Sequence, residues 1–245
     1  MAVVDLETTG FTAPEHAPVE IGIVPLVSAD RDLAGEPCFW TPVRGGGALV
    51  DPGRPIPPET SAIHHIVDAD VAGMPAWREA FAWLFDGAGY AAFAAHSAAT
   101  ERQWITGEYT AGAPWIDTWK CALRLWPEAP GHGNQMLRYW RRPARLDRDL
   151  ASPAHRAQPD AYVTAHLLID MLGLATLDQL IAWSAEPALL ARVPFGDAKG
   201  RPWAEADDGL LDWIIARDFD ENVMFTARHE KERRRRTGAA EDGEA

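Results

Sequence analysis

The 245-residue chain has few of the features that mark membrane, secreted or disulfide-stabilised proteins. No stretch of about 20 consecutive apolar residues, the length that crosses a bilayer, is present. The start lacks a basic segment followed by an apolar one, so no signal peptide is expected. Its two cysteines, Cys38 and Cys121, have no metal-type spacing and are too few for a disulfide framework. We therefore expect a soluble protein of a reducing compartment, the cytoplasm.

Positive charge is also scarce, since 23 Lys and Arg against 36 Asp and Glu leave a net charge of −13. A body this acidic does not coat nucleic acid through bulk electrostatics. The basic residues are clustered, however, with five Arg between Arg138 and Arg148 and six Lys or Arg between Arg228 and Arg236. A local basic rim is compatible with a polyanionic substrate. A solvated loop is an equally good interpretation of the first cluster.

The order of the predicted elements indicates a mixed α/β sheet, and the 47% hydrophobic content with 11 Trp is ample for its core. Three strands joined by short turns predict an antiparallel meander, and two later strands should run parallel to the first. The strands are expected at residues 2–8, 19–27, 36–43, 90–96 and 114–118, with residues 44–58 as loop. Helices are expected at residues 77–85, 99–109, 118–126, 134–140, 159–171 and 177–184.

A domain boundary is expected near Glu186-Pro187. Residues 1–186 would form the main domain, and residues 187–236 a small module with hairpin-like glycines and amphipathic helices. The polar residues 237–245 are predicted to be a disordered tail.

Two acidic residues, Asp5 and Glu7, end the first predicted strand before the turn at Gly10. Residues two apart on a strand point to the same face, about 6–7 Å apart. Carboxylates this close repel each other unless a positive charge lies between them. A strand end fraying into solvent is the alternative interpretation, and partners elsewhere in the chain decide between the two.

Two further acidic residues can supply such partners. Glu101 follows His96, which closes a predicted parallel strand, and Asp160 follows the loop residue His155 at the start of a helix. Alone, neither is remarkable, because a helix N-terminus favours a carboxylate anyway. Together with Asp5 and Glu7 they lie where open α/β sheets form their sites. The four carboxylates are hard oxygen ligands suited to Mg²⁺ or Mn²⁺. Two such ions, about 3.5–4 Å apart, can hold a scissile phosphate while a histidine takes a proton from water.

Three segments, DLETTG, AHSAATE and HRAQPD, in this order and spacing resemble the three motifs of the DEDDh 3′–5′ exonucleases, which have a ribonuclease H-like fold. The last motif has the form H-x-A-x-x-D, met by His155, Ala157 and Asp160. The chain is most similar to the exodeoxyribonuclease X branch of this family. That likeness runs through SAIHHI, WIDTWKCALRLWP, YVTAHLLIDML and the FG-x-x-x-G element at residues 195–200.

The resemblance implies a hydrolase that shortens DNA from its 3′ end, most simply single-stranded DNA in repair, with two Mg²⁺ or Mn²⁺ ions. It assigns metal ligation to Asp5, Glu7 and Asp160 and the role of general base to His155. It places the terminal nucleotide against a set of residues near the motifs, namely Thr8, Thr9, Phe11, Ile63 and His64. For His64, a surface position on a helical turn is an equal alternative. Contacts to backbone phosphates would come from the basic cluster, namely Arg138, Arg141, Arg142 and Arg145.

The chain departs from the family pattern in the second motif, which usually reads H-N-x-x-F-D. Glu101 replaces the Asp, and Ser97 and Thr100 replace the Asn and Phe. We expect Glu101 to bind metal after a small shift. The C-terminal element has Asp197 where that branch of the family is more basic, which weakens a nucleic-acid role for the module.

Other functions remain open at this point. Nothing in the sequence recognises a 2′-hydroxyl, so DNA over RNA rests on the resemblance alone. An exoribonuclease with the same chemistry is one alternative. A catalytically weak nucleic-acid-binding accessory protein is another, although His155 and the other three carboxylates argue against it. A proofreading partner of a polymerase is disfavoured by the additional C-terminal module.

Overall fold

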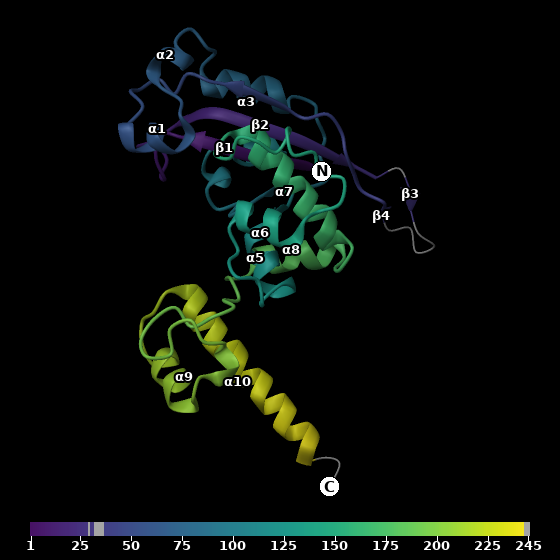
Figure 1. Cartoon of the computed structure of the whole chain (residues 1–245), viewed down its shortest axis with the longest axis vertical. Coiled ribbons are helices and arrows are strands. Elements are labelled where there is room, and N and C mark those ends of the chain that lie inside the picture. Colours follow the sequence, from purple (N-terminus) through teal and green to yellow (C-terminus); the bar gives the residue numbers. More distant parts are fainter. Residues whose placement is uncertain (29, 32–36, 243–245) are drawn as a thin grey trace.

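The computed structural model describes residues 1–28, 30–31 and 37–242, with a mixed sheet at the centre of the larger part (Figure 1). Strand β1 (Ala2–Thr8) pairs antiparallel with β2 (Pro18–Val27) and parallel with β7 (Phe93–Ala95). Strand β8 (Trp115–Asp117) pairs parallel with β7. The predicted mixed α/β class is thus confirmed, with an antiparallel start and later strands parallel to the first.

The third strand of the predicted meander is broken. Glu36 lies outside the described residues, and β4 (Pro37–Cys38) pairs with β3 (Asp30–Arg31) in a separate ribbon. Within the described part of this predicted strand, only β5 (Thr41–Pro42) pairs with β2. The two halves are separated by Phe39, whose φ of 57° does not fit an extended strand.

The prediction that residues 44–58 are entirely loop is wrong. Strand β6 (Gly46–Leu49) pairs antiparallel with β2 over four residues. Gly47 is needed for packing, because a Cβ on it would lie 2.8 Å from the Cβ of Gln158. A glycine-rich segment therefore serves here as a strand over which a helix passes closely.

The other regular elements are helices and two short 3-10 segments (η1 and η2). They are α1 (Pro58–His64), α2 (Asp68–Val71), α3 (Trp77–Phe85), η1 (Glu101–Gln103), α4 (Gly107–Thr110), α5 (Thr118–Leu125), α6 (Asn134–Arg141), α7 (Ala157–Leu172), α8 (Leu177–Ala185), η2 (Trp203–Glu205), α9 (Asp208–Ile215) and α10 (Glu221–Asp242). The helix predicted at residues 99–109 is wrong, since η1 and α4 replace it. Thr106 is extended between these two short elements.

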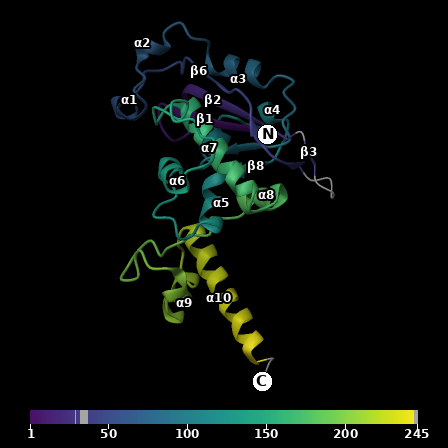
Figure 2. The ribbon, with the colours of Figure 1, turned by 45° about the vertical axis from the view of Figure 1, so that its right-hand side comes forward.

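Strand β1 separates two hydrophobic clusters because its side chains alternate between the two faces of the sheet. Val3 packs with α5, α7 and α8, whereas Ala2, Val4 and Leu6 pack with α3 and the aromatic residues of β7 and α4. Helix α7 crosses β1 and β2 in Figures 1 and 2. By the same alternation Asp5 and Glu7 face the side that α7 covers.

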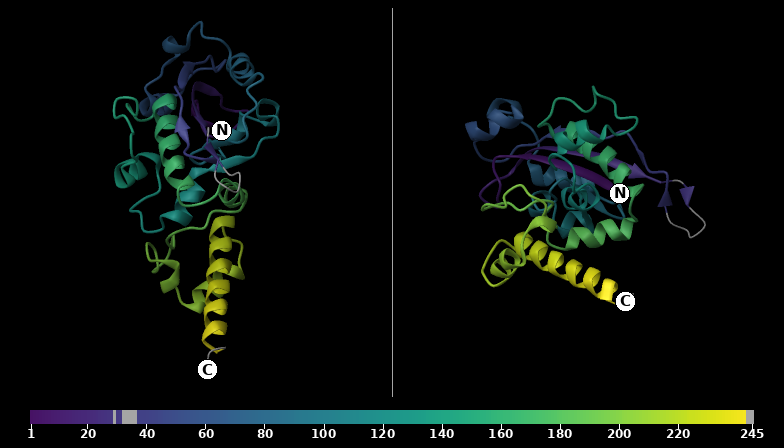
Figure 3. Two further views of the ribbon diagram at one scale, coloured as in Figure 1. Left: turned by 90° about the vertical axis from the view of Figure 1, so that its right-hand side faces the viewer. Right: turned by 60° about the horizontal axis from the view of Figure 1, so that its bottom comes forward.

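Residues after α8 form a smaller unit. Val193, Trp203, Leu211, Ile214 and Val223 belong to a hydrophobic cluster of their own. Figure 3 shows α9 and α10 beside one another, with the C-terminal end of α10 pointing away from the sheet. We therefore propose that a domain boundary lies near residue 186.

The disordered tail at 237–245 stays a prediction. The backbone of α10 is helical through Asp242, and residues 243–245 lie outside the described part.

No single helix in the described ranges is long and apolar enough to cross a membrane, and α7 with α8 passes such a test only as a pair bent by 114°.

Candidate active site

Three acidic side chains converge where β1 ends beneath α7. Asp5, Glu7 and Asp160 each place a ligand atom within 4.8 Å of the others. They line a cavity of about 390 Å³ together with Leu6 of β1 and with residues of the loops and of α6, namely His96, Gly133, Asn134, Gln135, Met136 and His155. The structure thus brings together three of the four predicted metal ligands and the predicted general base.

A glycine in β2 permits this convergence. Gly22 pairs with Asp5 in the sheet register, and a Cβ on Gly22 would lie 2.2 Å from the backbone carbon of Ala157. The first turn of α7 therefore rests directly on the strand next to β1. Any larger residue at position 22 would push α7, and with it Asp160, away from Asp5.

Helix α7 begins at Ala157, two residues before the predicted start at Pro159, because β2 supplies its cap. Glu20 is 5% exposed and accepts bonds from the backbone N–H of Ala157 at 3.0 Å and from the Arg156 guanidinium at 2.6 and 2.9 Å. Sequence reasoning missed this pair. A charged residue within the otherwise apolar stretch of β2 is a signal that could have found it, because a buried carboxylate needs a partner.

The acidic cluster is electrostatically unfavourable without a cation. Burial, and then repulsion from Glu101 and Glu7, raise the pKa of Asp5 well above its usual range. Burial, followed by repulsion from Asp160 and Glu20, raises the pKa of Glu7 to about 8. A bound cation would stabilise the ionised form of these carboxylates and so offset the repulsion between them. The donor set is all oxygen, which fits Mg²⁺ or Mn²⁺.

Glu101 lies beside this cluster at the start of η1 and is 4% exposed. The close group of three does not include it, yet its charge is the neighbouring charge that acts most strongly on Asp5. One carboxylate oxygen, Oε2, is buried and has no hydrogen-bond partner in the part of the chain that the structure describes. Burial raises the pKa of Glu101 to about 8. A buried, unpartnered carboxylate oxygen next to three other acids supports a cation at this corner. Its metal role stays a prediction.

Asp160 is held by donors on both oxygens. The backbone N–H of His155 donates to Oδ2 at 2.7 Å, and Nε2 of Gln135 donates to Oδ1 at 2.5 Å. Burial raises the pKa of Asp160 above its usual range, while these two donors act in the opposite direction. The first turn of α7 and its preceding loop thus fix the position of the carboxylate.

His155 lies on the loop before α7 with an exposed side chain and a φ of 58°. Its backbone is anchored by the bond to Asp160, and its side chain lines the acidic cavity. A histidine placed this way can reach a water molecule at the acidic cluster without being buried in it. The role of general base stays a prediction.

The loop after β1 contains two of the predicted substrate residues with contrasting surroundings. Phe11 is 81% exposed, and its backbone carbonyl accepts a 3.0 Å bond from Gln103 Nε2. Thr9 is buried and accepts a 3.0 Å bond from the backbone N–H of Ala17. Thr8 donates to the carbonyl of Gly10 at 2.7 Å. The exposed ring is thus free for a ligand, whereas the hydroxyls of both threonines stabilise the loop.

Helix α1 supplies the other two predicted substrate residues. Ile63 is 47% exposed, but His64 is only 2% exposed and accepts a 3.0 Å bond from the N–H of Ile66. Burial lowers the pKa of this imidazole. His64 is thus buried and bonded to the chain that follows α1, and the surface alternative for it is not met. Ile63 remains available for contact.

The four predicted phosphate-binding arginines do not share one environment. Arg138 is 6% exposed and is bonded internally, so no phosphate contact is proposed for it. Arg141 lies near Asp170 and over the ring of Trp126. Arg142 and Arg145 are exposed, each with positive φ, on the loop after α6. Of the four arginines, only Arg142 and Arg145 are therefore proposed to contact phosphates.

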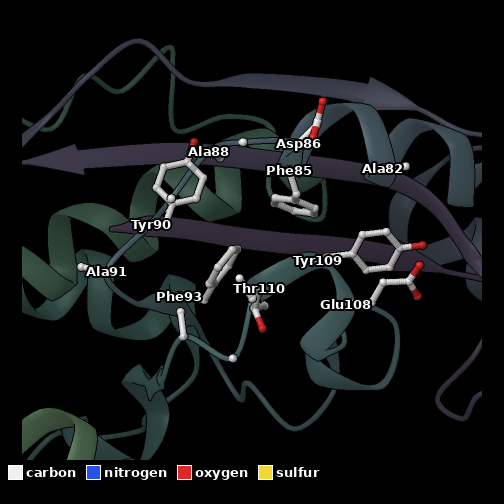
Figure 4. Close-up of a pocket in the computed structure, with 15 residues that line it drawn as sticks. Ala82, Phe85, Asp86, Ala88, Tyr90, Ala91, Phe93, Glu108, Tyr109 and Thr110 are labelled. Atoms are coloured by element: carbon white, nitrogen blue, oxygen red, sulfur yellow. The ribbon is translucent and has the colours of Figure 1, made fainter.

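A second cavity, of about 730 Å³, lies near the start of β7, away from the acidic cluster. Figure 4 shows its aromatic side chains, Phe85, Tyr90, Phe93 and Tyr109, with Asp86 and Glu108 at its edge. It contains two carboxylates rather than a close group of three. Chemistry rather than volume therefore identifies the smaller cavity as the candidate site.

Comparison with known proteins agrees with this site. The exonuclease family model RNase_T matches residues 2–168. Exodeoxyribonuclease 10 of Escherichia coli K12 is 32% identical over 223 residues, which cover 88% of this chain and 90% of that protein. The DNA polymerase III subunit epsilon-like protein of Rhodobacter capsulatus is 32% identical over 177 residues, covering 69% of this chain and 23% of that protein.

Solved structures agree as well. Exonuclease X in complex with 5′ overhanging duplex DNA superimposes with a TM-score of 0.59 and 29% identity, covering 75% of this chain and 99% of that one. Escherichia coli exonuclease I in complex with a dA16 oligonucleotide shares the fold, with a TM-score of 0.50, 12% identity and coverage of 74% and 42%. The ribonuclease H-like architecture and the resemblance to exodeoxyribonuclease X are thereby confirmed. The chain belongs to the DnaQ-like exonuclease family.

Proposed function

We propose that the protein is a metal-dependent 3′–5′ exonuclease that removes nucleotides from the 3′ end of DNA, preferably single-stranded. The convergence of Asp5, Glu7 and Asp160 within 4.8 Å carries this proposal. DNA rather than RNA is supported by the relative whose structure contains DNA and by the exodeoxyribonuclease. The cytoplasm stays the predicted location.

In this proposal Asp5, Glu7 and Asp160 hold two Mg²⁺ or Mn²⁺ ions, with Glu101 at the adjoining corner. Ions bound there would supply an activated water and charge stabilisation for the departing 3′-oxygen. The chain must also keep these carboxylates close despite their repulsion. Gly22, the Glu20–Arg156 pair and the donors to Asp160 do this by fixing α7 against β2.

His155 would take the proton from the attacking water. Its side chain is exposed at the edge of the acidic cavity, where a proton can pass on to solvent. The backbone bond to Asp160 keeps the imidazole near the cluster without occupying either ring nitrogen. Such a general base contributes about 10²–10⁴-fold to a rate.

The terminal nucleotide would lie against two exposed apolar side chains, Phe11 and Ile63. Gln103 supports the Phe11 loop by donating to the carbonyl of Phe11 and accepting from the N–H of Ala13, both at 3.0 Å. Stacking on an apolar ring tolerates any base, which suits an enzyme that shortens a chain of arbitrary sequence. Arg142 and Arg145 would meet the backbone phosphates.

The decisive experiment compares substrates that differ in one feature. Single-stranded DNA, recessed duplex DNA and RNA, each labelled at the 5′ end, are incubated with Mg²⁺, Mn²⁺ or chelator. A ladder that shortens from the 3′ end, absent with chelator and with Asp5→Ala, supports the proposal. Asp86→Ala, an exposed acid at the far cavity, is the matched control and should retain activity.

Other outcomes identify the alternatives. Faster shortening of RNA than of DNA would indicate an exoribonuclease. Binding of DNA without shortening under either metal would indicate an accessory protein and would contradict the proposal.

A further inference from the structure

Gln135, on helix α6, contacts the acidic cluster from outside the three sequence motifs. We propose that Gln135 is a positioning residue that orients the Asp160 carboxylate for metal binding, and that Arg138 fixes Gln135 for this task. The inference rests on the metal site of the proposed exonuclease. Its direct evidence is the 2.5 Å bond from Gln135 Nε2 to Asp160 Oδ1.

The orientation of the Gln135 amide is fixed by its second partner. Arg138 Nη1 donates to Gln135 Oε1 at 3.1 Å. A guanidinium has donors and no acceptor, so the carbonyl end of the amide must face Arg138. The amino end must then face Asp160, which has only acceptors when ionised. The pair of contacts therefore permits one orientation of the amide and excludes the flipped one.

Arg138 is itself held in place by the loop that leads to His155. It is 6% exposed, and Nη1 also donates to the carbonyl of Ala151 at 2.6 Å. Nη2 lies 3.5 Å from the carbonyl of Arg148, a long contact. A buried guanidinium with several carbonyl partners has little freedom to move. Arg138 thus connects the basic loop to Gln135, and Gln135 in turn connects Arg138 to Asp160.

These contacts leave Asp160 able to bind a cation. A carboxylate has about four acceptor positions, and Gln135 and the N–H of His155 use one on each oxygen. The remaining positions are free to face Asp5 and Glu7. A neutral amide suits this role, because a lysine at position 135 would neutralise Asp160 and compete with the metal ion. Gln135 orients the ligand and leaves its charge intact.

The test measures metal binding separately from catalysis. The metal-free protein and its Gln135→Leu variant are titrated with Mn²⁺ in a calorimeter, without nucleic acid. We expect Gln135→Leu to bind Mn²⁺ about 10–100-fold more weakly, the usual effect of losing a partner that orients a metal ligand. Its metal-free melting temperature should stay close to that of the wild type, since the apolar part of the side chain is kept.

Gln158→Leu is the matched control. Gln158 lies in α7, two residues before Asp160, with its Cβ near Gly47, and among the described contacts it makes no hydrogen bond to Asp160. Wild-type affinity in Gln135→Leu would overturn the inference, and so would an equal loss in Gln158→Leu. A lower melting temperature with unchanged affinity would show a merely structural role and would also overturn it.

Arg138→Met tests the second half of the inference. Because Arg138 acts on Asp160 through Gln135, the double variant should bind Mn²⁺ no more weakly than Gln135→Leu alone. Additive losses would overturn the role of Arg138. Should Arg138→Met not fold, Gln135→Leu still decides the first half. Mn²⁺ affinity that depends on Gln135, in a wild type that shortens no nucleic acid, would leave this inference standing and contradict the proposed function.

Discussion

The two ends of the acidic cluster differ in how their carboxylates are held. Asp160 has a donor on each oxygen, from Gln135 and from the backbone of His155. Glu101 is also buried, but no described residue forms a hydrogen bond to its Oε2. The Asp160 end is thus arranged before any ion binds, whereas Oε2 at the Glu101 end has no hydrogen-bond donor among the described residues. The corner that departs from the family pattern is also the one whose hydrogen bonds are incomplete.

The largest expected effect comes from the contact that places the Asp160 end. Gly22→Ala would put a Cβ within 2.2 Å of the Ala157 backbone, which must then move. We expect about 1–3 kcal/mol of destabilisation from overpacking and at least ~100-fold lower activity from the displaced carboxylate. Thermal unfolding and the exonuclease assay measure the two. Gly46→Ala, where a Cβ meets nothing within 4 Å, is the control, and equal behaviour of both variants would contradict the account.

At the Glu101 end, removing the negative charge while keeping the shape of the side chain should lower activity. Glu101→Gln is expected to lower Mg²⁺-dependent activity about 10–100-fold, by analogy with residues that support metal sites. The matched variant is Asp117→Asn, because Asp117 is also buried and acts electrostatically on Glu101, yet it caps α5. Unchanged metal-dependent activity in Glu101→Gln would exclude Glu101 from the site.

The buried carboxyl group of Glu101 also predicts that the stability of the metal-free protein depends on pH. Burial raises the pKa of Glu101 from 4.5 to about 8, so the folded state retains a proton that the unfolded chain releases. Stability must then fall as the pH rises from 4.5 towards 8. Melting temperatures measured across this range should show a shallower decline for Glu101→Gln. Parallel curves for variant and wild type would show that Glu101 is not the group responsible.

The smallest expected effect lies outside the carboxylates. Phe11 is 81% exposed, so Phe11→Ala should change stability little. Loss of stacking, worth about 1–3 kcal/mol per base, should raise KM for single-stranded DNA about tenfold with kcat less affected. Steady-state kinetics on a short oligonucleotide distinguish the two. Phe39→Ala, also exposed at 80%, is the control, and the same KM change there would remove Phe11 from the substrate site.

The sequence predicts the parts of this site that depend on local pattern. Strand alternation places Asp5 and Glu7 on one face, and the packing of Val3 on the opposite side from Ala2 and Val4 agrees with that pattern. The mixed sheet follows from the order of its elements. Helix α5 also forms at its predicted position.

What the sequence does not predict depends on contacts between distant segments. Gly22 looks like any glycine in a strand until Ala157 is seen against it. Glu20 meets Arg156 from 136 positions away, and no local pattern indicates that pairing. Gln135 is an ordinary helix residue in the sequence. Its role becomes visible only when α6 lies beside the start of α7.

The central claim is that the three converging carboxylates bind divalent metal, and calorimetric titration of the metal-free protein with Mn²⁺ tests it most directly. The account predicts that the wild type binds Mn²⁺ and that Asp5→Ala loses this binding, while Asp86→Ala retains it. Absence of Mn²⁺ binding in the wild type, or equal binding by the wild type and Asp5→Ala, would contradict the account.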